Sequence, residues 1–254
     1  MFLAPLLLAA GISASSHDIK VQTVSYHQDT TALEGQLVSL KSKAKLPGVL
    51  LMPDWMGVTP QALAYAKRVS DWGYVVFVAD LYGKDAQPKT SQDAGKLAGA
   101  LKNNIPLLRE RAAAALAELK KQAGVDTTRI ATMGFCFGGE AALELARSGV
   151  DLKGVASIHG NLNTPLPQDS KNIKGKVLVL QGAEDPYATQ AQALTFMDEM
   201  RQAGTDWQLV FYGGVVHAFT NPGAGNDPKQ GVAYNAKADR RAFAVLKDFF
   251  QEAL

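Results

Sequence analysis

The decisive stretch of this chain reads Arg129-Ile-Ala-Thr-Met-Gly-Phe-Cys-Phe-Gly-Gly-Glu140. Its apolar start has the length of a buried strand, and the Ala- and Leu-rich residues that follow predict a helix. Between them, Gly134 and Gly138 stand two positions before and two after Cys136. This is the spacing of the G-x-nucleophile-x-G elbow, with cysteine in place of serine. The glycines are needed because a side chain at either position would collide with neighbouring backbone in so sharp a turn.

Two other interpretations of this turn are weaker. A lone cysteine is most often a small apolar core residue, but that role does not require glycines on both sides. A dinucleotide-binding loop of the form G-x-G-x-x-G needs its second glycine where Cys136 stands. We therefore predict that Cys136 is a nucleophile at the carboxyl edge of a sheet, where the start of the next helix favours negative charge.

Short apolar runs alternate with longer helical patterns along the rest of the chain. Two runs bracket polar residues 28–31 and predict an antiparallel hairpin. Further strands are expected at residues 49–52, 74–79, 130–133, 155–158, 177–180 and 209–212, and helices at 60–72, 107–122, 140–147, 190–202 and 236–251. A hairpin followed by repeating β-α units predicts an α/β fold, with a mostly parallel central sheet of about eight strands and helices on both faces.

Residues 17–254 contain no repeat, linker or shift in composition, so we expect a single domain. Residues 1–16 have the pattern of a signal peptide, an apolar run over 2–12 followed by Ser13-Ala14-Ser15-Ser16. We expect export to the periplasm or the medium. Because no Lys or Arg precedes the run, a hydrophobic N-terminal extension of a cytoplasmic protein is the alternative. The run is too short for a mature transmembrane helix, and no later segment is long and apolar enough, so no membrane span is expected.

Charge and cysteine content exclude several classes of protein. Lys plus Arg is 26 and Asp plus Glu is 24, without a basic stripe, which argues against nucleic acid as a partner. The single cysteine rules out an intrachain disulfide and a cysteine-rich zinc site. The four histidines include no pair spaced as metal ligands on one helix. We expect neither a metal nor a cofactor.

An elbow nucleophile of this kind is followed along the chain by an acid and then a histidine. The buried strand over 176–181 ends just before Asp185, and the strand over 208–212 ends just before His217. Both side chains are therefore expected at the same sheet edge as Cys136. Glu184 is the alternative acid, and His159 is expected to be structural, with pocket lining as its alternative role.

Several stretches together resemble the dienelactone hydrolase family, part of the α/β-hydrolase superfamily, over about residues 46–254. They are Asp54-Trp55-Met56-Gly57, Asp80-Leu81-Tyr82-Gly83-Lys84, Gly134-Phe-Cys-Phe-Gly-Gly139, Glu184-Asp185-Pro186 and His217-Ala-Phe219. The resemblance implies the α/β-hydrolase fold and a triad of Cys136, Asp185 and His217. It also implies an oxyanion hole made by the backbone N–H groups of Phe137 and Trp55.

The chain departs from the family pattern at three positions around the expected site. Well-studied members have a glutamate, which contacts the resting thiol, where this chain has the shorter Asp54. They bind the substrate carboxylate with two arginines, where this chain has Lys84 and Asn221. Lysine keeps the charge without the planar fork of arginine, and asparagine keeps neither. We expect Lys84 to be either an anion contact or a solvated surface residue, and dienelactone itself to be a poor substrate.

These residues predict a hydrolase of a small-molecule carboxylic ester or lactone, acting through a thioester acyl-enzyme. A thioesterase or acyl transferase on the same triad is one alternative. A hydrolase-fold binding or thiol-sensing protein, in which Cys136 does not turn over, is the other.

Overall fold

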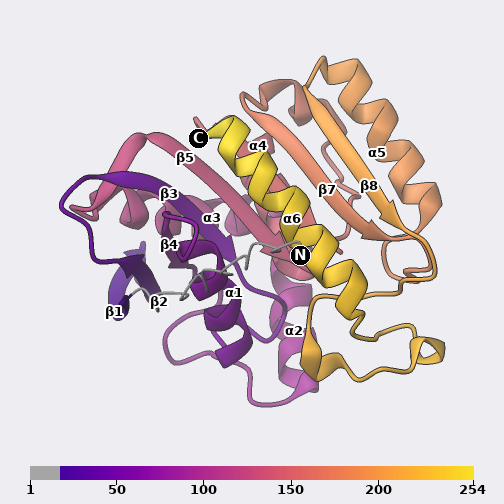
Figure 1. The fold of residues 1–254 in the computed structure, drawn as a ribbon, viewed down its shortest axis with the longest axis horizontal. Coiled ribbons are helices and arrows are strands. Elements are labelled where there is room, and N and C mark those ends of the chain that lie inside the picture. Colours follow the sequence, from indigo (N-terminus) through magenta and orange to yellow (C-terminus); the bar gives the residue numbers. More distant parts are fainter. Residues whose placement is uncertain (1–17) are drawn as a thin grey trace, which may run out of the picture.

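The computed structural model describes residues 18–254, so the predicted signal peptide lies outside the described residues. The strands are β1 (Ile19–Gln28), β2 (Thr31–Leu40), β3 (Leu46–Met52), β4 (Val75–Val78), β5 (Val125–Phe135), β6 (Gly154–Ile158), β7 (Lys176–Gly182) and β8 (Trp207–Tyr212). They form one sheet in the order β1-β2-β4-β3-β5-β6-β7-β8 (Figure 1). β2 is antiparallel to both of its neighbours, and every other adjacent pair is parallel. The predicted hairpin and mostly parallel sheet are confirmed.

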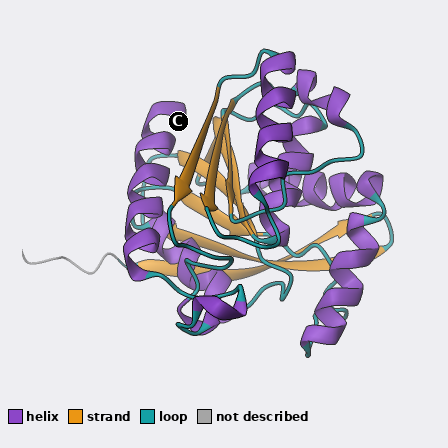
Figure 2. Ribbon diagram, turned by 90° about the vertical axis from the view of Figure 1, so that its right-hand side faces the viewer, coloured by secondary structure: helices purple, strands orange, loops and turns teal. Residues whose placement is uncertain are grey.

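Helices cover both faces of this sheet (Figure 2). They are α1 (Pro60–Ser70), α2 (Ser91–Lys102), α3 (Ile105–Lys121), α4 (Phe137–Arg147), α5 (Gln190–Ala203) and α6 (Ala236–Ala253), with 3-10 turns η1 (Pro167–Asn172), η2 (Pro222–Ala224) and η3 (Pro228–Gln230). The apolar side chains of α1 and α6 belong to one core cluster, and those of α2 to α5 belong to the other. Within residues 18–254, no helix is both long and apolar enough to cross a membrane.

The central strands are apolar throughout because they are buried on both faces, as parallel strands between helical layers must be. In β3, Leu50 and Met52 point into the cluster of α2 to α5, whereas Val49 and Leu51 point into the cluster of α1 and α6. All four side chains are fully buried. The two core layers therefore meet at the sheet, and the strand ends carry the loops that approach solvent.

The periodicity of the sequence did not predict helix α2. Its twelve residues include Gly95 and Gly99, which weaken the helical pattern. The local signal that identifies it is a capping box, in which the Thr90 side chain accepts the Asp93 N–H and the Asp93 carboxylate accepts the Thr90 N–H.

A buried cluster of charged side chains connects α4 to neighbouring segments. Arg147 is fully buried and lies 3.0 Å from the Glu144 carboxylate and 2.8 Å from that of Glu199 on α5. Arg109 on α3 joins the cluster through Glu144, at 2.8 Å, and through Asp169 on η1, at 2.6 Å. Each buried charge is compensated, as a low-dielectric interior requires. The cluster thereby ties three separate segments, α3, α5 and η1, to the helix that follows Cys136.

The turn between β5 and α4 depends on a very close approach of backbones. A Cβ atom placed on Gly138 would lie 2.1 Å from the Met52 carbonyl oxygen and 2.3 Å from that of Pro53. A Cβ on Gly134 would lie 1.9 Å from the Gly138 carbonyl oxygen. These contacts are to rigid backbone. A side chain at Gly138 therefore forces the end of β3 and the start of α4 apart, and one at Gly134 forces β5 and the start of α4 apart.

Replacement of Gly138 by alanine is expected to destabilise the fold by roughly 3 kcal/mol or more, because the added methyl group overlaps two carbonyl oxygens. Gly99→Ala is the matched control, since no atom lies within 4 Å of a Cβ at this position of α2. There the same substitution should stabilise the protein by about 0.5–1 kcal/mol. Urea unfolding of both variants measures the difference. Equal effects of the two substitutions would contradict the steric account.

Candidate active site

Three of the predicted residues follow the carboxyl ends of three parallel strands. Cys136 follows directly after β5, Asp185 comes three residues after β7, and His217 comes five residues after β8. Parallel strands direct their carboxyl ends to the same edge of the sheet, where binding sites of open α/β sheets lie. The fold therefore gathers these residues at one edge although about eighty positions separate the first from the last.

Cys136 occupies a strained position at the start of α4. Its backbone has φ 54° and ψ −120°, a combination that residues with a side chain rarely adopt. Its N–H group is shared between the Ile158 carbonyl, at 3.0 Å, and Nδ1 of His159, at 3.2 Å. The side chain is half-buried, at the boundary between core and solvent. The thiol is thus held rigidly at the first turn of a helix, where negative charge is stabilised.

His217 lies between the cysteine and the acid. Its Nδ1 is 2.8 Å from Oδ2 of Asp185, and its other side-chain partner is the thiol of Cys136. Burial by itself would lower the pKa of His217, but hydrogen bonds to Asp185 and Cys136 and the negative charge of both partners raise it to about 9. The arrangement therefore favours the protonated form of the His217 imidazole.

The carboxylate of Asp185 accepts four hydrogen bonds. Oδ2 accepts from His217 and, at 3.0 Å, from the Gln181 amide, while Oδ1 accepts the backbone N–H groups of Tyr187 and Ala188 at 2.8 and 3.1 Å. The carboxylate is buried, and these bonds leave it a single orientation. The neighbouring Glu184 is exposed, so Asp185 is the acid that meets the histidine.

Two backbone N–H groups near the cysteine lack a protein acceptor. Among residues 18–254, neither Phe137 nor Trp55 donates its N–H to another protein group. Phe137 is the first residue of α4, and Trp55 follows the β3 end that packs against Gly138. The Trp55 carbonyl accepts the Tyr82 hydroxyl at 2.9 Å, which fixes that peptide. The two N–H groups are available to a negatively charged oxygen.

Asp54 is close to the same site. Burial raises the pKa of its carboxyl group above the usual value, while the Met56 N–H and the positive charge of His217 act in the opposite direction. Its Oδ1 accepts that Met56 N–H at 2.8 Å. Asp54 and Cys136 both raise the pKa of Tyr82, after the larger effect of burial. The carboxylate is therefore a second acidic group within electrostatic reach of His217.

The two residues at the positions of the family's arginines have partners of their own. Lys84 forms an ion pair with Glu34 of β2, at 3.2 Å. The Asn221 side chain accepts the N–H of Gly223 at 2.8 Å and caps η2. Neither contact joins these side chains to Cys136 or His217.

Two aromatic side chains contact His217: Tyr187, which the sequence did not identify as a site residue, and His159, for which it predicted a structural role with pocket lining as the alternative. The exposed ring of Tyr187 meets His217 edge to face, with ring centroids 5.1 Å apart, and the buried ring of His159 does so from another side at the same distance. His159 also has a positive φ of 42°, and Ala218, the residue after His217, has a φ of 56°. Strained backbone of this kind clusters at functional sites, but it carries no sequence signal outside glycine.

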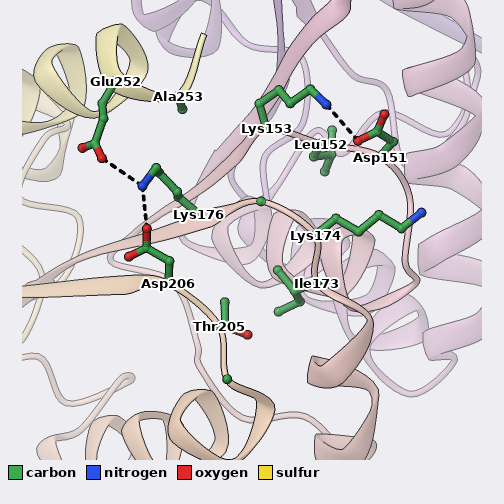
Figure 3. A pocket seen from close by; sticks show the side chains of 12 residues that line it. Asp151, Leu152, Lys153, Ile173, Lys174, Lys176, Thr205, Asp206, Glu252 and Ala253 are labelled. Atoms are coloured by element: carbon green, nitrogen blue, oxygen red, sulfur yellow. Dashed lines mark hydrogen bonds and ion pairs between the residues drawn. The ribbon is translucent and has the colours of Figure 1, made fainter.

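A separate cavity of about 460 Å³ lies at the opposite, amino edge of β6 to β8 (Figure 3). Its charges pair within it, Lys176 with Asp206 and Glu252 at 2.5 and 2.9 Å, and Lys153 with Asp151 at 3.3 Å. It shares no residue with the cysteine site. Elsewhere in residues 18–254, no three His, Cys, Asp or Glu side chains are grouped as metal ligands.

Comparison with known proteins identifies the same fold and family. The solved structure of m3DLH is 34% identical, with a TM-score of 0.89 and coverage of 93% of this chain and 99% of that one. A dienelactone hydrolase-like promiscuous phosphotriesterase from metagenomic libraries is 33% identical, with a TM-score of 0.87 and coverage of 92% and 98%.

Among curated proteins, an uncharacterized protein of Caenorhabditis elegans is 32% identical over 58% of this chain and 94% of its own length. A candidate carboxymethylenebutenolidase of Aquifex aeolicus is 23% identical over 92% of this chain and 99% of its own. The model of the dienelactone hydrolase family matches residues 33–254. This chain therefore belongs to the dienelactone hydrolase family of ester and lactone hydrolases.

Proposed function

We propose that this protein hydrolyses carboxylic esters or lactones through a triad of Cys136, His217 and Asp185, by way of a thioester acyl-enzyme. The observation that carries the proposal is the continuous contact from thiol to imidazole to carboxylate, in which Asp185 lies 2.8 Å from one ring nitrogen of His217 and Cys136 lies on its other side. A nucleophile, a base and a group that orients the base are the parts that covalent hydrolysis requires.

Acylation begins with the Cys136 thiolate beside the protonated His217. The sulfur attacks the carbonyl carbon of the substrate, and the carbonyl electron pair moves to oxygen. The free N–H groups of Phe137 and Trp55 are the donors proposed for this oxyanion, and each such donor typically contributes about 3 kcal/mol to the transition state. When the carbon–oxygen bond breaks, His217 gives its proton to the departing alkoxide and leaves a thioester.

Deacylation uses the histidine in its neutral form. Once the thiolate is acylated, its share in raising the pKa of His217 is gone while that of Asp185 remains, and the neutral ring takes a proton from water. The resulting hydroxide attacks the thioester, the thiolate leaves as a carboxylic acid forms, and the ion pair is restored. Thiolate is a good leaving group, so esters and lactones suit this site better than amides.

The residues around the triad favour a substrate without a carboxylate. Lys84 is paired with Glu34, and Asn221 has no charge. The additional acidic group near His217, Asp54, would repel an anionic substrate. The exposed aromatic ring of Tyr187 lies beside His217 instead. We therefore propose neutral esters or lactones as the substrate class.

Replacement of Cys136 by alanine should reduce hydrolysis of p-nitrophenyl acetate by at least about 10³-fold, because no other group forms the acyl-enzyme. Cys136→Ser, which keeps the elbow but carries a poorer nucleophile, is the control for folding. Mass spectrometry of the wild type after rapid quenching should show one added acyl group at Cys136. Equal rates in wild type and Cys136→Ala would support a non-catalytic binding or thiol-sensing protein. Faster turnover of an acyl thioester than of the ester would favour the thioesterase alternative.

The substrate proposal predicts that p-nitrophenyl butyrate is hydrolysed with a kcat/KM about tenfold higher than its analogue with a terminal carboxylate on the acyl chain, a difference of about 1.4 kcal/mol. Lys84→Ala should leave this ratio unchanged. A preference for the carboxylate that disappears in Lys84→Ala would instead identify Lys84 as the anion contact.

Stability should depend on pH through His217. Its pKa is raised from the unfolded value of 6.5 to about 9, so its protonation stabilises the folded state fully below pH 6.5, and the contribution is lost as pH rises through about 9. Urea unfolding should therefore show wild type losing on the order of 1–3 kcal/mol more than His217→Gln across this interval. Parallel curves for the two proteins would show that no such ion pair exists.

A further inference from the structure

His159 contacts both the nucleophile turn and the loop that carries His217. Nδ1 of His159 accepts the Cys136 N–H at 3.2 Å, and Nε2 lies 3.0 Å from the hydroxyl oxygen of Thr220. Thr220 is three residues beyond His217, and both side chains are buried. A single imidazole therefore joins two segments that are far apart in sequence and that hold the two reacting side chains.

The contacts determine which nitrogen of His159 carries the proton. A backbone N–H can only donate, so Nδ1 must be the unprotonated acceptor, and Nε2 donates to Thr220. The Thr220 hydroxyl continues to the Tyr65 hydroxyl, at 3.0 Å. Tyr65 belongs to α1 and stacks on Phe135, with ring centroids 3.8 Å apart. The chain of hydrogen bonds thus ends on a rigid helix.

The surroundings of His159 keep the ring neutral. Burial, followed by the charge of His217, holds the pKa of His159 well below its usual value. Phe135 and Phe219 pack around the ring, and His217 is the only titratable side chain with a ring contact to it among residues 18–254. Asp185, Cys136 and Asp54 act on His217 itself.

The backbone at His159 is costly for a residue that only fills space. Its φ of 42° is in the left-handed region, where a side chain is disfavoured. Glycine would adopt this conformation without strain. The next residue, Gly160, is a glycine that approaches Gly139 closely. Both ring nitrogens of this strained, buried histidine are hydrogen-bonded, which points to a specific role for the imidazole.

We propose that His159 is a positioning residue that sets the separation of the Cys136 thiol and the His217 ring, by binding the Cys136 N–H with one nitrogen and Thr220 with the other. This inference rests on the proposed triad. The edge-to-face contact with His217, at 5.1 Å between centroids, limits how that ring tilts. Loss of the link lets the thiol and imidazole move apart, which weakens the ion pair before any effect on substrate binding.

Three substitutions separate the parts of this link. His159→Leu removes both hydrogen bonds and leaves an apolar side chain of similar size. His159→Asn keeps an acceptor near the position of Nδ1 and tolerates the positive φ, but it does not reach Thr220. Thr220→Val has nearly the same shape, removes the hydrogen bonds of Thr220 to His159 and Tyr65, and leaves the contact of His159 with the Cys136 N–H, so it provides a test even if His159→Leu fails to fold.

The measurement is the rate of Cys136 alkylation by iodoacetamide from roughly pH 5 to pH 10, which follows the thiolate. The wild-type profile gives the reference midpoint for the variants. His159→Leu should raise this midpoint and slow alkylation at pH 6.5 by about tenfold or more, because the imidazole moves away from the thiol. Thr220→Val should move it in the same direction by a smaller amount, and His159→Asn should stay within about threefold of the wild-type rate.

Turnover of p-nitrophenyl acetate provides the second measurement. We expect kcat to fall in His159→Leu while KM stays within about twofold, since the substrate contacts are not altered. Wild-type alkylation profiles in both His159→Leu and Thr220→Val, with only a lower melting temperature, would mean that His159 merely stabilises the fold. Undiminished turnover in Cys136→Ala would overturn the triad, and the positioning role with it. A midpoint that no variant moves, in a protein that needs Cys136 for turnover, overturns the positioning role alone.

Discussion

The arrangement of the whole site depends on how closely the start of α4 approaches the end of β3. Only a hydrogen atom fits at Gly138 beneath the Met52 and Pro53 carbonyls, and Gly134 is equally confined against Gly138. That approach turns the chain so sharply that Cys136 takes a positive φ. It also brings the first N–H of α4 beside the loop that contains Trp55. The position of Cys136 and of two free N–H donors thus follows from one packing constraint.

Electrostatics then determine what this geometry does chemically. His217 is buried, and burial alone would favour a neutral ring, yet its contacts with Asp185 and Cys136 outweigh that effect and keep it protonated. His159 is also buried but has no acidic partner, so its ring stays neutral. The ring centroids of the two histidines lie 5.1 Å apart, yet His217 is protonated and His159 is neutral, because their neighbours differ. One is suited to proton transfer and the other to holding the backbone.

The charged residues away from the site have a different role. The buried cluster around Arg147 binds α3, α5 and η1 to α4, and its charges compensate one another within it. Lys84 and Glu34 likewise form a closed pair between β2 and the loop after β4. Charges that are already paired contribute rigidity to the frame and offer little to an incoming anion. The proposed preference for neutral substrates rests on the same distribution of charges.

The amino-acid sequence alone determined the elbow, the sheet with its N-terminal hairpin, and the order of cysteine, acid and histidine. These are local signals, since glycine spacing, apolar periodicity and a residue's position after a strand are visible within a few neighbours. Helix α2 was not predicted because Gly95 and Gly99 weaken its apolar periodicity. Only the tertiary structure decided that Asp185 and not Glu184 meets His217, that Lys84 pairs with Glu34, and that His159 links Cys136 to Thr220. Such contacts join segments far apart in sequence, and their distances exist only once the sheet order has brought those segments together.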